Sequence, residues 1–201
     1  MTTAADSIAG LYDRHAAGWD DDRRHRRPDG EAAWITRFAA LAGSGASVLD
    51  LGCGSGAPIV PDLRAAGLTV TGVDASPSLI ALCRERFPDQ AWVVADMRRI
   101  DLGRFGGLLL WHSLFHLPPD DQAAMFPVLA RHLTPGAPLM FTSGTERGET
   151  VGQWRGEPLY HASLDLSDYE GVLADNGLRL IERVVGDASC GGATIWLAVR
   201  L

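Results

Sequence analysis

SVLDLGCGSGAP, residues Ser47 to Pro58, is the stretch that decides the fold. It begins as a short apolar run with Asp50 near its end, and then places glycine at the alternate positions Gly52, Gly54 and Gly56. Glycine loses much backbone entropy on folding and adds no packing, so this pattern predicts a turn or a close approach of the main chain to another group. We interpret that group as a ligand bound beyond a buried strand.

The composition is that of one soluble globular domain, with 201 residues of which 46% are hydrophobic and 21% charged. No apolar run approaches the ~20 residues that cross a bilayer, and the first residues lack a secretory signal, so we expect a cytoplasmic protein without a membrane partner. The net charge of -7 disfavours nucleic acid as a partner. Three cysteines without metal-type spacing are expected to be reduced thiols, and no metal site is expected.

Apolar runs alternate with helical patterns from residue 46 onward. Strands are expected at 47–51, 68–74, 91–96, 107–111 and 137–143, with helices at 58–66, from Ser76-Pro77 onward, and at 120–132, where Pro127 should bend the helix. This alternation predicts an α/β fold, a Rossmann-like doubly wound parallel sheet with helices on both faces. Two last strands, 178–185 and 194–201, have no helix between them and are expected to pair antiparallel at the edge.

The flanking segments are less regular. One amphipathic helix is expected from Ile8 to Trp19, and a second over 34–42. The charge run DDDRRHRR, residues 20–27, mixes both signs and is expected to be a solvated, mobile connection. Near the other end, a capping box at 167–170 should open a helix that ends at Asn176-Gly177.

Carboxylates follow two later strands. Ligands of open parallel sheets bind beyond the carboxyl ends of the strands, where the strand order reverses. Asp74 ends the second strand about 20 residues past the glycine loop, where such folds place an acid on the ribose hydroxyls. Asp96, after the third strand, is placed to accept from an adenine amino group, with the Met97 amide beside it.

Charge decides which nucleoside fits. A dinucleotide fingerprint reads G-x-G-x-x-G, whereas this loop reads G-C-G-S-G-A-P and is preceded by Asp50. A carboxylate beside a pyrophosphate is unfavourable by about 1 to 4 kcal/mol per charge pair. Beside an ammonium and a sulfonium it is favourable, so the loop suits S-adenosylmethionine.

The motifs VLDLGCGSGAP, VTGVDASPSLI, VVADM and LLLWHSLFHLPPDD together resemble those of class I S-adenosylmethionine-dependent methyltransferases acting on small molecules. The resemblance implies one methyltransferase domain, with cap helices at 1–45, a cofactor core at 46–143, a lid or substrate insert at 144–166, and a terminal helix and strand pair at 167–201. It also implies S-adenosylhomocysteine as product, a small-molecule acceptor, and a monomer or homodimer. The implied cofactor residues are Asp50, Gly52, Cys53, Gly54, Gly56, Asp74, Ala75, Asp96, Met97, and the main chain at Trp111 and His112.

Other side chains are candidates for the reaction itself. Methyl transfer needs alignment above all, and a general base helps where the acceptor must lose a proton. His116, with His112 as the second choice, is the candidate base, and the alternative is that His116 only caps or hydrogen-bonds within the loop-to-helix junction. Tyr12 and Trp19 are candidates to face the sulfonium, and core packing is the equal alternative. Candidate substrate residues in the insert are Trp154, Tyr160 and His161.

Two other functions stay open. A non-catalytic S-adenosylmethionine-binding protein would share every cofactor residue. A nucleotide-dependent oxidoreductase is disfavoured by the loop spacing and by Asp50. No Asn/Asp-Pro-Pro-Tyr motif follows the fourth strand, because SLFHL occupies its place, so amide and adenine nitrogens are disfavoured as acceptors.

Overall fold

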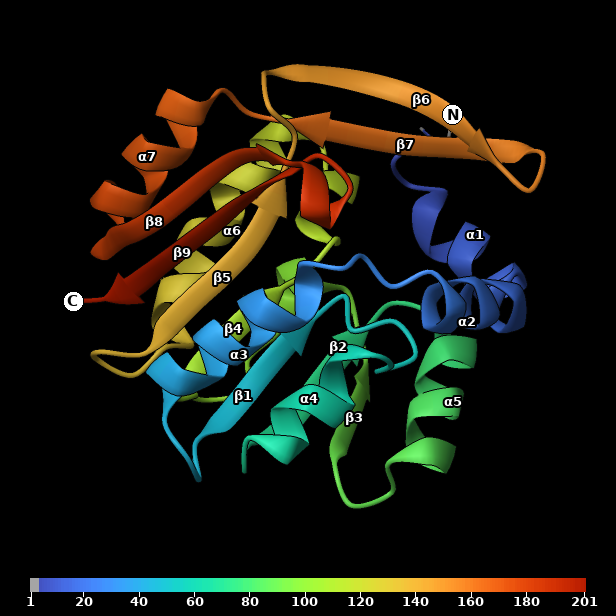
Figure 1. Cartoon of the computed structure of the whole chain (residues 1–201). Helices are drawn as coiled ribbons and strands as arrows, with labels where there is room; N and C mark the ends of the chain where they lie inside the picture. The colour runs from blue at the N-terminus through green and yellow to red at the C-terminus, as the bar shows by residue number, and fades with distance from the viewer. Residues whose placement is uncertain (1–3) are drawn as a thin grey trace.

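The structure, a computed structural model, describes residues 4–201 and centres on a seven-stranded sheet (Figure 1). The strand order is β3-β2-β1-β4-β5-β9-β8. The strands are β1 (Ser47–Leu51), β2 (Thr69–Asp74), β3 (Ala91–Val94), β4 (Gly107–Leu110), β5 (Pro138–Ser143), β8 (Leu178–Asp187) and β9 (Ala193–Arg200). β1 to β5 run parallel, and β9 pairs antiparallel with both β5 and β8. The predicted doubly wound sheet with an antiparallel terminal pair is therefore confirmed.

Helices cover both faces of this sheet. They are α3 (Glu31–Ala42), α4 (Ile59–Ala65), α5 (Pro77–Arg86), α6 (Pro119–Arg131) and α7 (Leu166–Asp175), whereas α1 (Ile8–Arg14) and α2 (Ala16–His25) pack against α5. Short 3-10 turns are η1 (Met97–Arg99), η2 (Leu114–His116) and η3 (Ala188–Cys190). Alternate residues of β4 enter opposite cores: Leu108 and Leu110 meet α6 and α7, whereas Leu109 meets α3 and α4. This period of two is what a strand buried on both sides requires.

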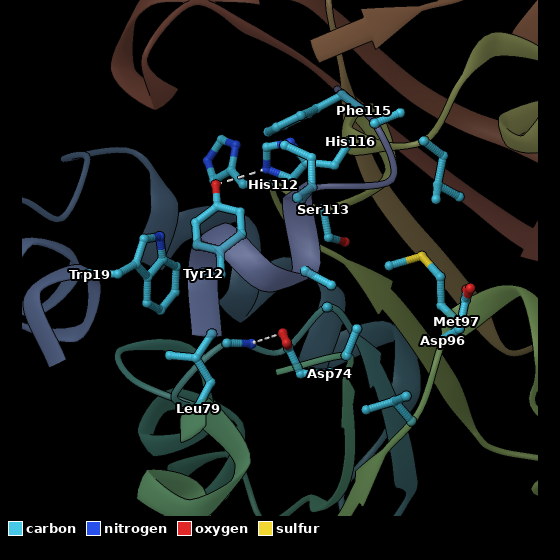
Figure 2. Close-up of a pocket in the computed structure, with 18 of the residues that line it drawn as sticks. Tyr12, Trp19, Asp74, Leu79, Asp96, Met97, His112, Ser113, Phe115 and His116 are labelled. Atoms are coloured by element: carbon cyan, nitrogen blue, oxygen red, sulfur yellow. Dashed lines mark hydrogen bonds between the residues drawn. The ribbon is translucent and has the colours of Figure 1, made fainter. Parts of the chain in front are cut away.

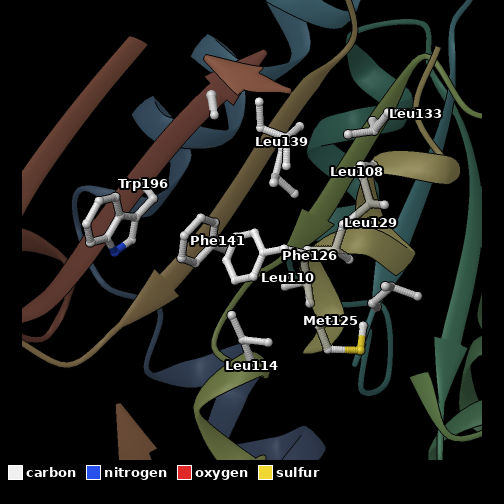
Figure 3. Packing of buried hydrophobic residues seen from close by; sticks show 14 of the residues in the cluster. Leu108, Leu110, Leu114, Met125, Phe126, Leu129, Leu133, Leu139, Phe141 and Trp196 are labelled. Atoms are coloured by element: carbon white, nitrogen blue, oxygen red, sulfur yellow. The ribbon is translucent and has the colours of Figure 1, made fainter. Parts of the chain in front are cut away.

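The core on the α6 side is built around aromatic rings (Figure 3). Phe141 on β5 stacks on Trp196 of β9, with ring centroids 5.6 Å apart and planes 2° apart. Phe126 of α6 meets Phe141 edge-on at 5.5 Å. Because β5 and β9 lie side by side, this stack ties the antiparallel pair to the parallel part of the sheet.

The N-terminal helices differ from the sequence prediction. The single helix expected from Ile8 to Trp19 breaks at His15 into α1 and α2. The charge run expected to be a mobile connection instead continues α2 as far as His25. The reason is tertiary, because Asp20 is only 5% exposed and pairs with Arg86 on α5. A charge pattern read along the chain does not show a partner 66 residues away.

The insert predicted at 144–166 forms a separate antiparallel hairpin, β6 (Gly148–Trp154) and β7 (Glu157–Ser163). Figure 1 shows it lying along one side of the molecule, next to α1. The helix that follows begins at Leu166 with Asp165 as its N-cap, so the capping box predicted at 167–170 is wrong. Asp165 instead accepts a hydrogen bond from the Arg147 amide at 3.2 Å. None of the helices in residues 4–201 has the length and apolar character to cross a membrane.

Candidate functional site

A cavity of about 720 Å³ lies beyond the carboxyl ends of β1, β2, β3 and β4 (Figure 2). This volume is within the range of small-molecule sites. The strand order reverses between β1 and β4, which is where ligands bind in open α/β sheets. Of the residues predicted for the site, those that line the cavity are Tyr12, Trp19, Gly52, Gly54, Asp74, Ala75, Asp96, Met97, His112, His116 and His161.

The glycine loop is packed closely by protein side chains. Gly52 and Gly54 have positive φ values of 73° and 57°, so a side chain there would be strained. A Cβ atom on Gly52 would overlap Ser113, and one on Gly54 would overlap the Trp19 ring. Gly56 lies toward the core, next to Phe87 and Trp92. The close approach that the sequence suggested for a ligand is therefore made here by Ser113 and Trp19.

Asp74 ends β2 at the wall of the cavity. Its Oδ2 accepts a hydrogen bond from the Gly54 amide at 2.9 Å, and its Oδ1 accepts from the Ser76 amide at 2.9 Å. Burial raises the pKa of this carboxyl above its usual value, although the backbone amides oppose the shift. The carboxylate thus ties the glycine loop to the start of α5. Ser76 caps that helix as predicted, accepting from the Leu79 amide at 3.1 Å.

A smaller cavity of about 40 Å³ adjoins the large one and is lined by Asp50, Arg23 and Trp19. Asp50 is 3% exposed, and burial, with repulsion from Asp74, raises its pKa to about 7. Arg23 on α2 lines both cavities and lowers that pKa. A buried carboxyl group and a guanidinium therefore share one small polar compartment.

Arg23 is held by Glu31, the first residue of α3. Glu31 is fully buried, pairs with both Arg23 and Arg27, and accepts from the Trp111 indole at 2.6 Å. Arg23 keeps one buried nitrogen, Nη1, without a hydrogen-bond partner in the part of the chain that the structure describes. Sequence analysis missed Arg23, because it lies in the charge run that was interpreted as a solvated connection.

Asp96 and Met97 lie at the other end of the cavity floor. Asp96 caps η1 by accepting from the Arg98 amide at 2.9 Å. The Arg98 guanidinium, which also pairs with Asp121, lowers the pKa of Asp96 below its usual value. Figure 2 shows Asp96 and Met97 across the cavity from Tyr12 and Trp19.

The histidines lie on the segment after β4. His116 Nδ1 lies 2.9 Å from the Tyr160 carbonyl oxygen, and its Nε2 lies 2.9 Å from the Tyr12 hydroxyl. A carbonyl only accepts, so Nδ1 carries the proton and Nε2 accepts from Tyr12. Burial lowers the pKa of His116 and that of His112 to about 4, so both rings are neutral at pH 7. His112 adopts a φ of 54°, and its amide donates to Thr142 Oγ1 at 3.0 Å.

Some predicted residues lie away from the large cavity. Cys53 and Trp111 line the smaller one. Trp154 packs on Tyr12, with ring centroids 5.8 Å apart. Tyr160 donates its hydroxyl to Glu149 at 2.6 Å, and its ring belongs to an apolar cluster with Ile8. Tyr160 thus reaches the site only through its carbonyl oxygen.

Among the residues that line the large cavity without having been predicted are Ser113, Phe115 and Leu79. Ser113 donates to the Leu51 carbonyl at 2.6 Å, which fixes the turn after β4 against β1. Phe115 lies between two predicted histidines in sequence, and no periodic pattern marks it. Within residues 4–201, no group of three or more His, Cys, Asp or Glu side chains is arranged to hold a metal ion.

Residues 48–136 match the family model described as a methyltransferase domain. The chain is 35% identical over 107 residues to a carboxy-S-adenosyl-L-methionine synthase of Chromohalobacter salexigens, covering 49% of this chain and 40% of the relative. It is 26% identical over 150 residues to a magnesium-protoporphyrin O-methyltransferase of Rhodobacter capsulatus, covering 72% and 64%. The chain therefore matches about two fifths to two thirds of the length of these relatives.

Among solved structures, a magnesium protoporphyrin IX methyltransferase from Synechocystis, with bound S-adenosylmethionine, superposes with a TM-score of 0.74 at 19% identity. That match covers 100% of this chain and 99% of the other. A TehB-like S-adenosylmethionine-dependent methyltransferase from Corynebacterium glutamicum gives 0.71 at 22% identity, covering 96% and 99%. At these identities the likeness concerns the fold.

Proposed function

Because the chain carries a methyltransferase domain of the class I S-adenosylmethionine-dependent family, we propose that it transfers a methyl group from S-adenosylmethionine to a small-molecule acceptor and releases S-adenosylhomocysteine. The observation that carries this proposal is that Asp50 and Arg23 line one small cavity beside the glycine loop. The methionyl end of the donor carries an ammonium and a carboxylate. A buried acid and a buried, unpaired guanidinium nitrogen in one compartment match those two charges.

The donor fits the remaining wall in the same way. Asp74 would accept from the ribose hydroxyls, and Asp96 with the Met97 amide would contact the adenine edge. Ala75 lies under the same part of the cavity. The main chain at Trp111 and His112 would contact the methionyl amine. Gly52 and Gly54 line the cavity between these two ends, so one elongated molecule can touch all of them.

When bound, the donor supplies a methyl group on a positively charged sulfur. The chain's own residues would then hold the reacting groups in line, which is where most of the rate comes from in such a displacement. Tyr12 and Trp19 offer ring faces near that charge, with centroids 5.9 Å apart and planes nearly perpendicular. His116 is the proposed base, because its ring is neutral and its unprotonated Nε2 accepts a hydrogen bond from Tyr12.

The acceptor would occupy the side of the cavity nearest α1 and the β6–β7 hairpin. His161 lines it there, 5.0 Å from His116 between ring centroids. Trp154 and Tyr160 support this wall from behind. We assign the segment 144–166 the role of a lid, and we treat the four parts of the chain described above as one domain. The lid is linked to the N-terminal segment, because Arg14 and His15 both pair with Glu157 on β7.

The acceptor class and the cellular compartment are proposed from the net charge and the cysteines of the chain. The net charge of -7 supports a small acceptor over nucleic acid. Cys53, Cys83 and Cys190 are all free thiols, which supports a reducing compartment such as the cytoplasm. The assembly is proposed to be a monomer or homodimer.

Calorimetric titration tests the proposal. We expect S-adenosylhomocysteine to bind and NAD to show no heat, and Arg23→Ala to weaken the complex. Binding of NAD alone would remove the proposal in favour of an oxidoreductase. If the donor binds but no methyl transfer is found across a broad acceptor library by mass shift, the alternative of a non-catalytic S-adenosylmethionine-binding protein replaces it.

A further inference from the structure

One end of the cavity is walled by four rings, Tyr12, Phe115, His116 and His161, which we call the aromatic end. Their centroids lie close together: 4.8 Å for Phe115 and His116, 5.1 Å for Phe115 and His161, and 5.3 Å for Tyr12 and His116. Figure 2 shows Phe115 and His116 across the cavity from Asp74. Rings packed on one another in this way form a continuous apolar wall of the cavity, against which a flat molecule can lie.

The aromatic end is electrically neutral. Burial lowers the pKa of His116 to about 4 and lowers that of His161, so both imidazoles are uncharged at pH 7. The arginines that line the cavity are engaged elsewhere: Arg98 pairs with Asp96, Arg26 with Asp22, and Arg23 is assigned to the donor. An anionic acceptor would therefore lose its hydration at this end without gaining a counter-ion.

The hydrogen-bond direction fixes what the acceptor must present. His116 donates from Nδ1 to the Tyr160 carbonyl and accepts at Nε2 from the Tyr12 hydroxyl. The Tyr12 proton is thus committed to His116, and the Tyr12 oxygen is left with lone pairs. A molecule beside Tyr12 gains a hydrogen bond only if it donates one, so the acceptor carries a hydroxyl or an N–H.

The low basicity of His116 narrows the choice of acceptor group. An imidazole with so low a pKa takes a proton only from a comparatively acidic group. A phenol, with a pKa of about 10, is far more acidic than an aliphatic hydroxyl, which resembles water at about 15.7. We infer that the acceptor is a flat, uncharged aromatic molecule with a phenolic hydroxyl, and this inference rests on the proposed methyl transfer. Tyr12 passes the phenol's proton to His116.

The step balances. An oxygen–methyl bond forms as the sulfur–methyl bond breaks, with its electron pair left on sulfur. The phenol's proton moves to Tyr12 Oη while the Tyr12 proton moves to His116 Nε2. Tyr12 ends neutral, and His116 becomes an imidazolium whose Nδ1–H still donates to the Tyr160 carbonyl. The positive charge that leaves sulfur reappears on His116.

Binding gives the first test. With S-adenosylhomocysteine present, calorimetry should show that naphthol binds at least about 10-fold more tightly than naphthoate, which is the same ring system with a carboxylate. Naphthylmethylamine, a cation, is the third probe, because Asp6 also lines the cavity. Tighter binding of either charged probe overturns the inference. Failure of S-adenosylhomocysteine itself to bind would instead remove the proposed function.

Turnover separates the relay from a merely structural tyrosine. The matched acceptors are para-cresol, which keeps its proton at mildly alkaline pH, and para-nitrophenol, which is largely ionised there. In kcat, measured at saturating acceptor so that weak binding of the ionised phenol does not enter, Tyr12→Phe should lose about 100-fold or more on para-cresol and only a few-fold on para-nitrophenol, since the latter needs no base. An equal loss on both overturns the relay. Methylation of carboxylates or amines but of no phenol overturns the acceptor class and leaves the proposed function standing.

Discussion

Asp20 on α2 and Arg86 on α5 form a two-point ion pair, with Arg86 Nη1 and Nη2 each 2.9 Å from a carboxylate oxygen of Asp20. A second link lies nearby, where Asp13 accepts from the Ser76 hydroxyl and the Ser78 amide, both at 2.8 Å. These contacts hold the N-terminal helices against α5. Tyr12 on α1 and Trp19 on α2 line the cavity, so these contacts also fix the position of both rings.

Replacing Asp20 therefore tests how the N-terminal helices α1 and α2 are held against α5. Asp20→Asn keeps the shape but removes the charge, and we expect a loss of roughly 2 kcal/mol in the free energy of unfolding. Binding of S-adenosylhomocysteine should weaken as well. The matched control is Asp21→Asn, whose side chain is 66% exposed and which should change stability by no more than about 0.5 kcal/mol. Equal effects of the two variants in urea unfolding would contradict this account.

Asp74→Ala tests the ribose assignment. A carboxylate that accepts from sugar hydroxyls contributes ~1.5 to 3 kcal/mol, so the dissociation constant for S-adenosylhomocysteine should rise about 10- to 150-fold. The side chain also holds the Gly54 and Ser76 amides, so loop disturbance must be separated from ribose contact.

A ligand variant provides that separation. Wild-type protein should bind the dideoxyribose analogue of S-adenosylhomocysteine more weakly than the parent, and Asp74→Ala should bind the two alike. If Asp74→Ala still prefers the parent by the wild-type margin, Asp74 does not contact the ribose, and its role is confined to the loop.

The features that the sequence predicts well are local or periodic. The apolar runs of β1, β2 and β4 alternate with helical patterns, and this alternation is enough to specify a parallel sheet with crossovers. The Ser76-Pro77 cap depends on adjacent residues and is confirmed. Gly52, Gly54 and Asp74 line the predicted crevice because the topology alone places strand ends there.

The features that the sequence does not predict depend on distant partners. Arg23 belongs to the site because Glu31, which also accepts from the Trp111 indole, anchors it, and the residue type gives no sign of this. His15 separates α1 from α2, although the apolar spacing continues across it. Tyr160 has the residue type of a pocket wall, yet its hydroxyl turns to Glu149 on the neighbouring strand. Each outcome is decided by packing between elements far apart in the chain.

Asp50 should make stability depend on pH. Its pKa rises from the usual 3.8 to about 7 on folding, so the folded state binds more protons than the unfolded state across that window. The free energy of unfolding therefore falls as pH rises from about 4 to about 7. Asp50→Asn removes this loss, and its stability advantage should grow by roughly 2 to 3 kcal/mol between about pH 5 and pH 8.

The same variant should bind S-adenosylhomocysteine less tightly, because the ammonium loses its counter-ion. Thermal melts across pH, with calorimetry at one pH, measure both effects. An advantage that stays constant with pH would show that Asp50 is ionised throughout. Stronger binding by Asp50→Asn would place the ammonium elsewhere.

His116 should change the pH dependence of stability in the opposite direction to Asp50. Its pKa falls on folding from the usual 6.5 to about 4, so below about pH 6.5 the unfolded state binds the extra proton and stability is lost as pH falls through the window down to about 4. At about pH 5 the loss from this one ring is roughly 2 kcal/mol. His116→Gln should be spared it. Urea unfolding at several pH values measures this, and a wild-type slope in His116→Gln would mean that the ring has the same pKa in the folded and the unfolded protein. Such a ring would be a stronger base than the weakly basic imidazole from which a phenolic acceptor is inferred.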